Sequence, residues 1–331
     1  LRLVRAEMDG AAVAGLLTVG GFALFGKNLY NSLPITLGVF LYARLIKKPY
    51  RNVAASSLFA TALGPLVSEL SFGLGLTPWS GLIAGCGAGL AIGLIVLPLA
   101  DAFFHFHRGF NLYNIGFTAG IIGMFATGIL RMFDLQVEPR MLLSGGNNLV
   151  LSVYLLFVFA AIFLFGFYLN GWSLKNYLKL LALSGRLRAD FIEKCGYGIT
   201  LVNIAAMGVL SWAYVILIGG QLNGATIGGI FTVMGFSAYG KHPRNTLPIF
   251  AGAFLASLLN IHELNGTTAV IATLFGSTLA PIAGHFGIAA GIFAGFCHVS
   301  MALNVGYLHG GMNLYNNGFS GGFIAATLVP L

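Results

Sequence analysis

Long apolar stretches follow one another along almost the whole chain, and short polar or glycine-rich breaks separate them. This pattern predicts about twelve helical segments, near 10–26, 29–45, 53–70, 80–104, 109–131, 148–171, 197–219, 221–240, 245–262, 267–283, 284–306 and 311–331. A helix needs about 20 apolar residues to cross a bilayer. The short segments at 53–70 and 267–283 are broken by glycine and proline, which predicts half-helices or re-entrant pieces. We therefore expect an all-α membrane protein with about 10–12 membrane segments.

The composition points the same way. Hydrophobic residues make up 57% of the 331 residues and charged residues only 8%, whereas a soluble domain carries about 25% charged residues. A soluble globular enzyme and a disordered chain are therefore excluded. The net charge of +8 reflects lysines and arginines that gather in short loops between apolar stretches. This distribution is typical of cytoplasmic loops and does not indicate nucleic-acid binding.

The residue types that bind metals are scattered. Cys86, Cys195 and Cys297 lie far apart and form no CxxC motif, so neither a disulfide framework nor a zinc site is predicted. His105 and His107 point to different faces of a helix, and no third ligand accompanies them. We expect no metal and no other cofactor.

Three sequence blocks occur twice, in the same order. The pairs are FGKNLYNSLPITLGVF (25–40) with YGKHPRNTLPIFAGAF (239–254), SLFATALGPL (57–66) with TLFGSTLAPI (273–282), and HRGFNLYNIGFTAG (107–120) with HGGMNLYNNGFSGG (309–322). Such repetition predicts an internal duplication of the kind found in transporters. We assign the first repeat to 1–147, connecting helices with a cytoplasmic loop at 172–196 to 148–220, and the second repeat to 221–331.

The loop charges predict that the two repeats have opposite orientations in the membrane. The loop after the first Leu-Pro block carries four basic residues between Arg44 and Arg51, whereas its counterpart in the second half carries Glu263 and no lysine or arginine. Lys241 and Arg244 instead precede the second Leu-Pro block. Basic loops mark the cytoplasmic side of a membrane protein. The Leu-Pro helix therefore has its C-terminal end in the cytoplasm in the first half and its N-terminal end there in the second half. We expect a bacterial inner-membrane protein with a cytoplasmic N-terminus.

The paired Asn-Leu-Tyr-Asn motifs carry the strongest candidate site residues. Asparagine amides and tyrosine hydroxyls donate and accept hydrogen bonds without charge, which suits a small neutral solute such as an amide. The same groups would equally well hold the broken ends of the neighbouring helices, and the sequence leaves both roles open. The candidate pathway residues of these motifs are Asn111, Tyr113, Asn114, Asn313, Tyr315 and Asn316.

Other candidates lie in the first and second blocks and at segment ends. Phe40 and Phe254 would narrow a pore, and Thr36 would line it, although ordinary core or lipid-facing positions also fit them. Ionisable residues inside membrane segments are functional candidates by default. Possible coupling or mouth residues are Lys27, Lys241, Glu69, His285 and Asp101; interface lysines and loop-edge carboxylates are the competing interpretation.

The order of the blocks resembles that of the urea transporter family. In that family each half has an Asn/Pro-rich turn entering a glycine-rich helix, then a short Gly/Ser/Thr-rich segment, then a glycine-rich stretch with an aromatic-Asn pair. Tyr113-Asn114 and Tyr315-Asn316 match this pair, whereas Leu37 stands where the family has threonine. The resemblance implies paired half-helices and a homo-oligomer, a trimer, with one pore per subunit.

Three functions follow in order of preference. The first is a transporter or channel, not an enzyme, that passes a small polar, neutral, urea-like solute between the two repeats. The second is a proton-coupled transporter of a small metabolite. The third is a membrane-embedded enzyme or scaffold, for which Asp101, His105 and His107 are the one cluster of suitable groups. The expected partners are the solute, the bilayer and other copies of the chain.

Overall fold

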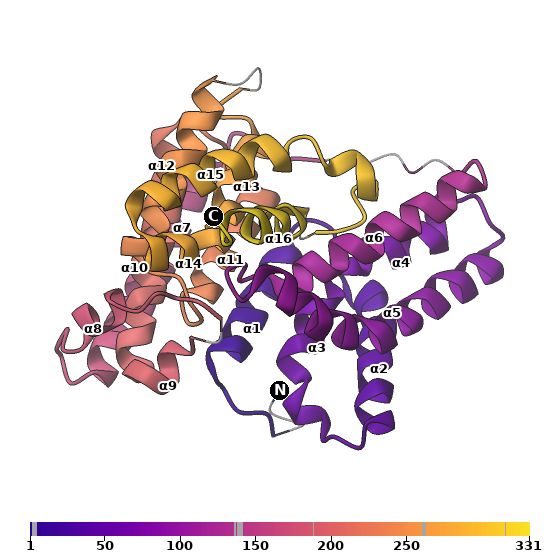
Figure 1. Cartoon of the computed structure of the whole chain (residues 1–331), viewed down its shortest axis with the longest axis horizontal. Coiled ribbons are helices and arrows are strands. Elements are labelled where there is room, and N and C mark those ends of the chain that lie inside the picture. Colours follow the sequence, from indigo (N-terminus) through magenta and orange to yellow (C-terminus); the bar gives the residue numbers. More distant parts are fainter. Residues whose placement is uncertain (2–4, 136, 138–141, 188, 260–262, 315) are drawn as a thin grey trace.

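The computed structural model describes residues 1, 5–135, 137, 142–187, 189–259, 263–314 and 316–331. All regular structure in this part of the chain is helical, and it contains no strand. The predicted all-α class is therefore confirmed (Figure 1).

Helices occupy each of the twelve predicted segments. Before the polar stretch near 172–196 they are α1 (Gly10–Phe22), α2 (Leu29–Leu45), α3 (Ala54–Ala60), α4 (Gly64–Ser68), α5 (Pro78–His107), α6 (Asn114–Met132) and α7 (Asn148–Leu169). The polar stretch holds two short helices, α8 (Tyr177–Leu181) and α9 (Phe191–Cys195). After it come α10 (Tyr197–Leu217), α11 (Gly224–Phe236), α12 (Pro243–Leu259), α13 (Thr267–Gly276), α14 (Ala280–Phe286), α15 (Ile288–Ala302) and α16 (Asn316–Leu328).

Five helical stretches in the described residues are long and apolar enough to cross a bilayer. They are 78–107, 114–132, 148–169, 197–217 and 267–286. Helices α1, α11 and α15 are apolar but shorter. These apolar helices indicate an integral membrane protein.

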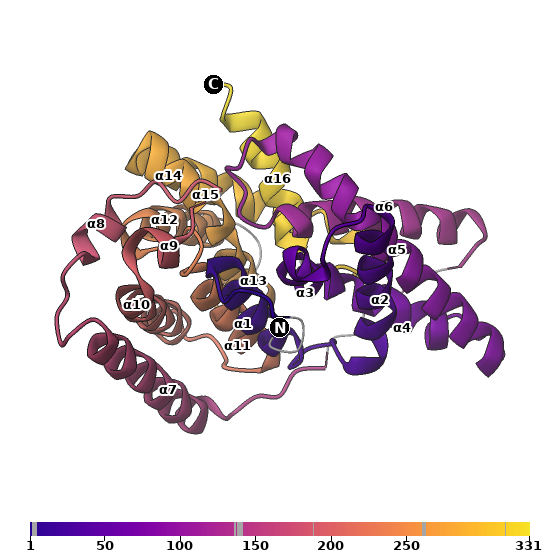
Figure 2. The same cartoon turned by 90° about the horizontal axis from the view of Figure 1, so that it is seen from below.

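Helix α7 lies at the edge of the molecule and packs against α10 (Figure 2). Only 17% of its apolar window is buried. The exposed side chains include Leu149, Val153 and Phe157. A helix that is apolar all round and buried on one side only suits contact with lipid or with another copy of the chain.

The closest helix pairs recur in the two halves. Helix α2 packs along α5, and α12 packs along α15. Gly38 and Gly252 make these approaches possible, because a Cβ atom at Gly38 would lie 2.2 Å from the Leu90 carbonyl oxygen and one at Gly252 would lie 1.8 Å from the Ile292 carbonyl oxygen. Small residues at helix contacts are the usual solution in lipid.

Two further pairs join the halves at the centre of the molecule, α1 with α11 and α6 with α16 (Figure 1). A Cβ atom at Gly120 of α6 would strike Phe319, and one at Gly322 of α16 would strike Phe117. Each helix of this pair thus sets a glycine against a phenylalanine of the other.

Candidate functional site

Two interrupted helices lie where the halves meet. A turn of 3-10 helix, Thr61–Leu63, separates α3 from α4, and a second, Ser277–Leu279, separates α13 from α14. Pro65 and Pro281 stand in the first turn of α4 and α14. Proline has no backbone N–H and its ring clashes with the preceding turn, so the α-helix ends and restarts at these points. The predicted breaks in 53–70 and 267–283 are confirmed.

A buried lysine contacts each break. The Lys27 Nζ donates to the Thr61 hydroxyl and lies 3.3 Å from the Leu58 carbonyl oxygen. The Lys241 Nζ donates to Ser277 Oγ at 2.7 Å and to Tyr113 Oη at 2.5 Å. Lys27 is 7% exposed and Lys241 is 0% exposed. Both lysines therefore lie inside the protein, at the breaks, and not at open mouths.

The described residues that lead into α6 and α16 form a tight turn in each half. Arg108 and Gly109 have φ values of 51° and 80°, and Gly310 and Gly311 have 55° and 73°. This left-handed backbone places the motif beside the preceding helix. The predicted segments 109–131 and 311–331 begin with this loop, and their helices start only at Asn114 and Asn316.

The last asparagine of each motif holds its loop in place. The Asn114 Oδ1 lies 2.8 Å from His107 Nε2, and its Nδ2 donates to the Ala100 carbonyl at 3.0 Å. Asn316 makes the matching contacts with His309 Nε2, at 2.6 Å, and the Ala302 carbonyl, at 3.5 Å. These amide groups are occupied by hydrogen bonds within the protein.

Each loop also bonds to the break in the other half. The Leu112 N–H donates to the Thr278 carbonyl at 3.0 Å, and the Leu314 N–H donates to the Ala62 carbonyl at 3.2 Å. The Thr278 hydroxyl also donates to Asn111 Oδ1 at 2.5 Å. The loop of one half therefore satisfies backbone groups that the interruption in the other half leaves free.

The first asparagine of each motif bonds across to the other half as well. The Asn111 Nδ2 donates to the Gly318 carbonyl at 2.9 Å, and the Asn313 Nδ2 donates to the Gly116 carbonyl at 3.4 Å. In both cases the acceptor lies in the first turn of the other half's final helix. Together with the loop bonds, these contacts run in both directions between the halves.

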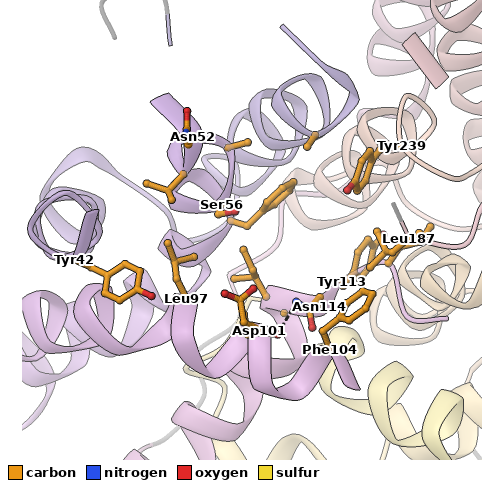
Figure 3. Close-up of a pocket in the computed structure, with 18 of the residues that line it drawn as sticks. Tyr42, Asn52, Ser56, Leu97, Asp101, Phe104, Tyr113, Asn114, Leu187 and Tyr239 are labelled. Atoms are coloured by element: carbon orange, nitrogen blue, oxygen red, sulfur yellow. Dashed lines mark hydrogen bonds between the residues drawn. The ribbon is translucent and has the colours of Figure 1, made fainter. Parts of the chain in front are cut away.

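A cavity of about 450 Å³ opens beside the first break (Figure 3). Tyr42 and Tyr113 lie at opposite ends of it, with Ser56 and Asp101 between them. Tyr113 and Phe236, which are both buried, close its inner end, with ring centroids 4.6 Å apart. The wall thus combines aromatic rings with hydroxyl, amide and carboxylate groups.

The structure brings only some of the predicted residues to this cavity. Tyr113, Asn114 and Asp101 line it, and Lys241 lies behind Tyr113. Asn111, Asn313 and Asn316 support the loops instead. Tyr315 lies outside the described residues.

Five other predicted residues do not line the cavity. Phe40 is half-buried against the Tyr50 ring at 5.7 Å, and Thr36 and Phe254 are half-buried on α2 and α12. Glu69 begins a π-helical turn after α4, and His285 is exposed beside the Phe110 ring.

The prediction overlooked several polar residues that shape the breaks. The Asn31 Nδ2 donates to the Gly26 carbonyl, and the Asn245 Nδ2 donates to the Gly240 carbonyl, both at 2.9 Å. Thr61, Ser277 and Thr278 supply the hydroxyls at the breaks. Two features of the sequence could have indicated these residues. One is the asparagine that precedes the Leu-Pro pair in both halves, and the other is the serine and threonine residues in the middle of the repeated segments 57–66 and 273–282.

The described residues contain no group of three or more histidine, cysteine, aspartate or glutamate side chains that could hold a metal ion. His107 is buried and turned toward Asn114, whereas Asp101 faces the cavity. His107, one of the three residues considered for an enzyme, therefore does not line the cavity with Asp101.

No match to the chain was found among curated proteins or among solved structures. The resemblance to urea transporters accordingly gains no support from these comparisons. A family model described as "Protein of unknown function (DUF1576)" matches residues 1–132 and 169–331. The unmatched stretch between them contains α7. The chain belongs to this family, an uncharacterised family whose member here is an apolar, all-helical membrane protein.

Proposed function

We propose that the protein is a transporter that passes a small polar solute between two repeats of inverted topology. The observation that carries this proposal is the reciprocal bonding of the loops and the breaks. The loop before α6 bonds to the break between α13 and α14, and the loop before α16 bonds to the break between α3 and α4.

Reciprocal contacts of this kind are the mark of a twofold axis, because residue i then meets residue j of the other unit and the reverse contact repeats. The glycine–phenylalanine contacts between α6 and α16 follow the same rule. The reversed loop charges around the Leu-Pro blocks support an axis that lies in the membrane plane. Both features support two inverted repeats.

Interrupted helices at such an axis suit a transport route. Irregular backbone at membrane depth is tolerated where protein or a water-filled cavity satisfies its polar groups. Substrate sites in inverted-repeat transporters lie where broken helices of the two halves meet. Here the cavity ends at Tyr113, whose hydroxyl bonds to Lys241, the lysine that contacts the second break.

The setting we propose is a bacterial inner membrane, with the N-terminus in the cytoplasm. The outward apolar face of α7 favours a homo-oligomer, and the resemblance noted in the sequence implies a trimer. We propose transport and not catalysis as the activity.

A proton-coupled transporter is the second candidate function. The observation in its favour is that Asp101 lines the cavity. Uptake that depends on a pH gradient and is lost in Asp101→Asn would support coupling. Uptake that is unchanged by both would rule it out.

Uptake into proteoliposomes tests the main proposal. We expect the purified protein to accelerate entry of at least one labelled solute from a panel of urea, acetamide, glycerol and benzoate, relative to empty vesicles. A bulky residue in the cavity wall, Ser56→Trp, should block that entry, whereas Lys175→Met on the exposed loop should not. No acceleration for any member of the panel would overturn the proposal.

A further inference from the structure

We infer that Asp101 and the aromatic rings around it form a binding site for the ammonium group of a small organic molecule. The site lies in the cavity of about 450 Å³ beside the first break. The inference deepens the proposed function and rests on it in one respect, since the bound molecule would be the transported solute.

The carboxylate of Asp101 is available to a ligand. Asp101 is the only acidic residue among the described residues that line the cavity, and its side chain is exposed. Within the described part of the chain it forms no ion pair and no hydrogen bond. Figure 3 shows it in the middle of the cavity, between Tyr42 and Tyr113. Both carboxylate oxygens can therefore accept hydrogen bonds from a molecule that enters.

The shared architecture of the two halves does not require this carboxylate. Asp101 lies in α5, which is long and apolar enough to cross a bilayer. Ionisable residues in such helices face the protein interior or a water-filled cavity and mark functional sites by default. Asp101 stands six residues before His107, and Leu303 stands six residues before His309 at the matching place in the second half. A function of the first cavity accounts for the acidic residue better than the fold does.

Aromatic rings are the second feature of the cavity that favours a cation. The face of an aromatic ring carries partial negative charge and attracts organic cations. The Phe59 and Phe236 ring centroids lie 5.3 Å apart, and those of Tyr113 and Phe236 lie 4.6 Å apart, so the three rings form a continuous surface. The aromatic residues of the cavity wall are Tyr42, Phe59, Phe104, Tyr113, Phe236 and Tyr239.

Uncharged hydroxyl groups supply further hydrogen-bond acceptors. Tyr42 and Ser56 line the same cavity, and their hydroxyls form no hydrogen bond with other described residues. An ammonium group has three N–H donors. One carboxylate together with neighbouring hydroxyls suits these donors, whereas a carboxylate ligand would be repelled by Asp101.

Lys48 determines which ammonium compounds fit. It is the only basic residue among the described residues that line the cavity, and it is exposed. Its charge repels a simple amine weakly, because water and salt screen exposed charges. The same charge attracts the carboxylate of a zwitterion. A simple amine and an amino acid share the ammonium group that Asp101 would bind, and they differ in their response to Lys48.

Binding to the purified full-length protein in detergent tests the site. The ammonium probes are labelled benzylamine and phenylalanine, and benzyl alcohol is the uncharged isostere of benzylamine. We expect saturable binding of at least one ammonium probe and much weaker binding of benzyl alcohol. Asp101→Asn should weaken the ammonium probe by about tenfold, because a charge-assisted hydrogen bond is lost, and should leave benzyl alcohol unchanged.

Asp134→Asn is the matched control, because Asp134 is an exposed aspartate that does not line the cavity. It should bind all three probes as the wild type does. If Asp101→Asn fails to fold, Asp101→Leu gives a second measurement, since leucine stands at the matching place in the second half. Equal affinities for the ammonium probes and benzyl alcohol, or unchanged ammonium binding in either folded Asp101 variant, would overturn the inference.

Lys48→Met separates the two kinds of ammonium compound. A gain of about twofold in benzylamine affinity, with benzylamine as the tighter probe, would support a simple amine. A loss of phenylalanine affinity, with phenylalanine as the tighter probe, would support a zwitterion.

The outcome separates this inference from the proposed function, and both ammonium probes join the uptake panel. Uptake of urea or acetamide without binding of an ammonium probe would overturn the ammonium site and leave the transporter proposal standing. Ammonium binding that depends on Asp101, in a protein that transports nothing, would retain the site and overturn the transporter proposal.

Discussion

The two interrupted helices share one backbone design but differ in exposure. Phe59 of α3 is half-buried, whereas Phe275, at the matching place in α13, is 1% exposed. Ser56 is likewise half-buried, and its counterpart Ala272 is 2% exposed. The cavity opens along α3. The two halves therefore share the backbone hydrogen bond between loop and break and differ in their access to water.

That difference has a simple meaning if the two halves are the inverted repeats that we propose. Alternating access requires each half to adopt in turn the packing that the other half shows. The side of α3 would then be the open side in this state, and the side of α13 the closed one. The backbone hydrogen bonds between loops and breaks would persist in both states, because they are common to both halves.

The largest expected effect tests the shared packing. Gly38→Ala and Gly252→Ala each place a Cβ atom against the backbone of a neighbouring helix. Overpacking that no side chain can relieve should destabilise each variant by about 2–3 kcal/mol or more. The melting temperature of the detergent-solubilised protein measures this loss.

Gly87→Ala and Gly128→Ala serve as controls, because a Cβ atom at either position meets nothing within 4 Å. Both should fold as the wild type does or slightly better. If only one of the Gly38 and Gly252 variants is destabilised, the matched packing of the two halves is wrong.

An effect on chemical labelling tests the difference in access. In a background lacking Cys86, Cys195 and Cys297, a cysteine in place of Ser56 should react with a water-soluble thiol reagent. A cysteine in place of Ala272 should react at least about tenfold more slowly, because opening of a closed side costs a few kcal/mol. Equal rates would mean that the two sides are equally open.

The smallest expected effect concerns the residue that caps the start of α1. Asp9 caps α1 by accepting from the Ala12 N–H at 2.7 Å, and Asn223 caps α11 in the same way. Partial burial raises the pKa of Asp9 above its usual value of 3.8, and the nearby Asp190 carboxylate adds to this rise. A raised carboxyl pKa favours folding below pH 3.8, and this contribution is lost as the pH rises through the folded pKa.

The Asp9→Asn variant should therefore have a higher melting temperature than the wild type at pH 7. The difference in melting temperature should be smaller at pH 4. Asparagine caps a helix as well as aspartate does, so the difference reports the charge. A larger gain at pH 4 than at pH 7 would contradict the assignment.

The sequence was sufficient for the helices and the breaks for a physical reason. Apolar runs are dictated by the bilayer, and proline at positions 65 and 281 suits the first turn of a helix that restarts after a break. All twelve segments therefore contain helix. The number of helices that cross the membrane is harder to predict from the sequence. Five helical stretches are long and apolar enough to cross, and the others are short or broken.

The site was harder to predict because its parts are joined only by tertiary contacts. Lys27 and Lys241 look like interface lysines in the sequence, and their burial depends on hydroxyl groups at the breaks, more than 30 residues away. The sequence allowed the asparagines of the repeated motifs either to line a solute pathway or to support the broken ends of the helices. Their bonds to backbone groups favour the supporting role, whereas Tyr113 lies in the cavity wall.

Labelling from the two sides of the membrane is the most direct test of the inverted arrangement. Single cysteines replace Arg51, just before α3, and Asn265, just before α13, in a cysteine-free background; both residues are exposed. An impermeant thiol reagent applied to right-side-out and inside-out vesicles should label the two positions from opposite sides. Labelling of both positions from the same side would contradict the account.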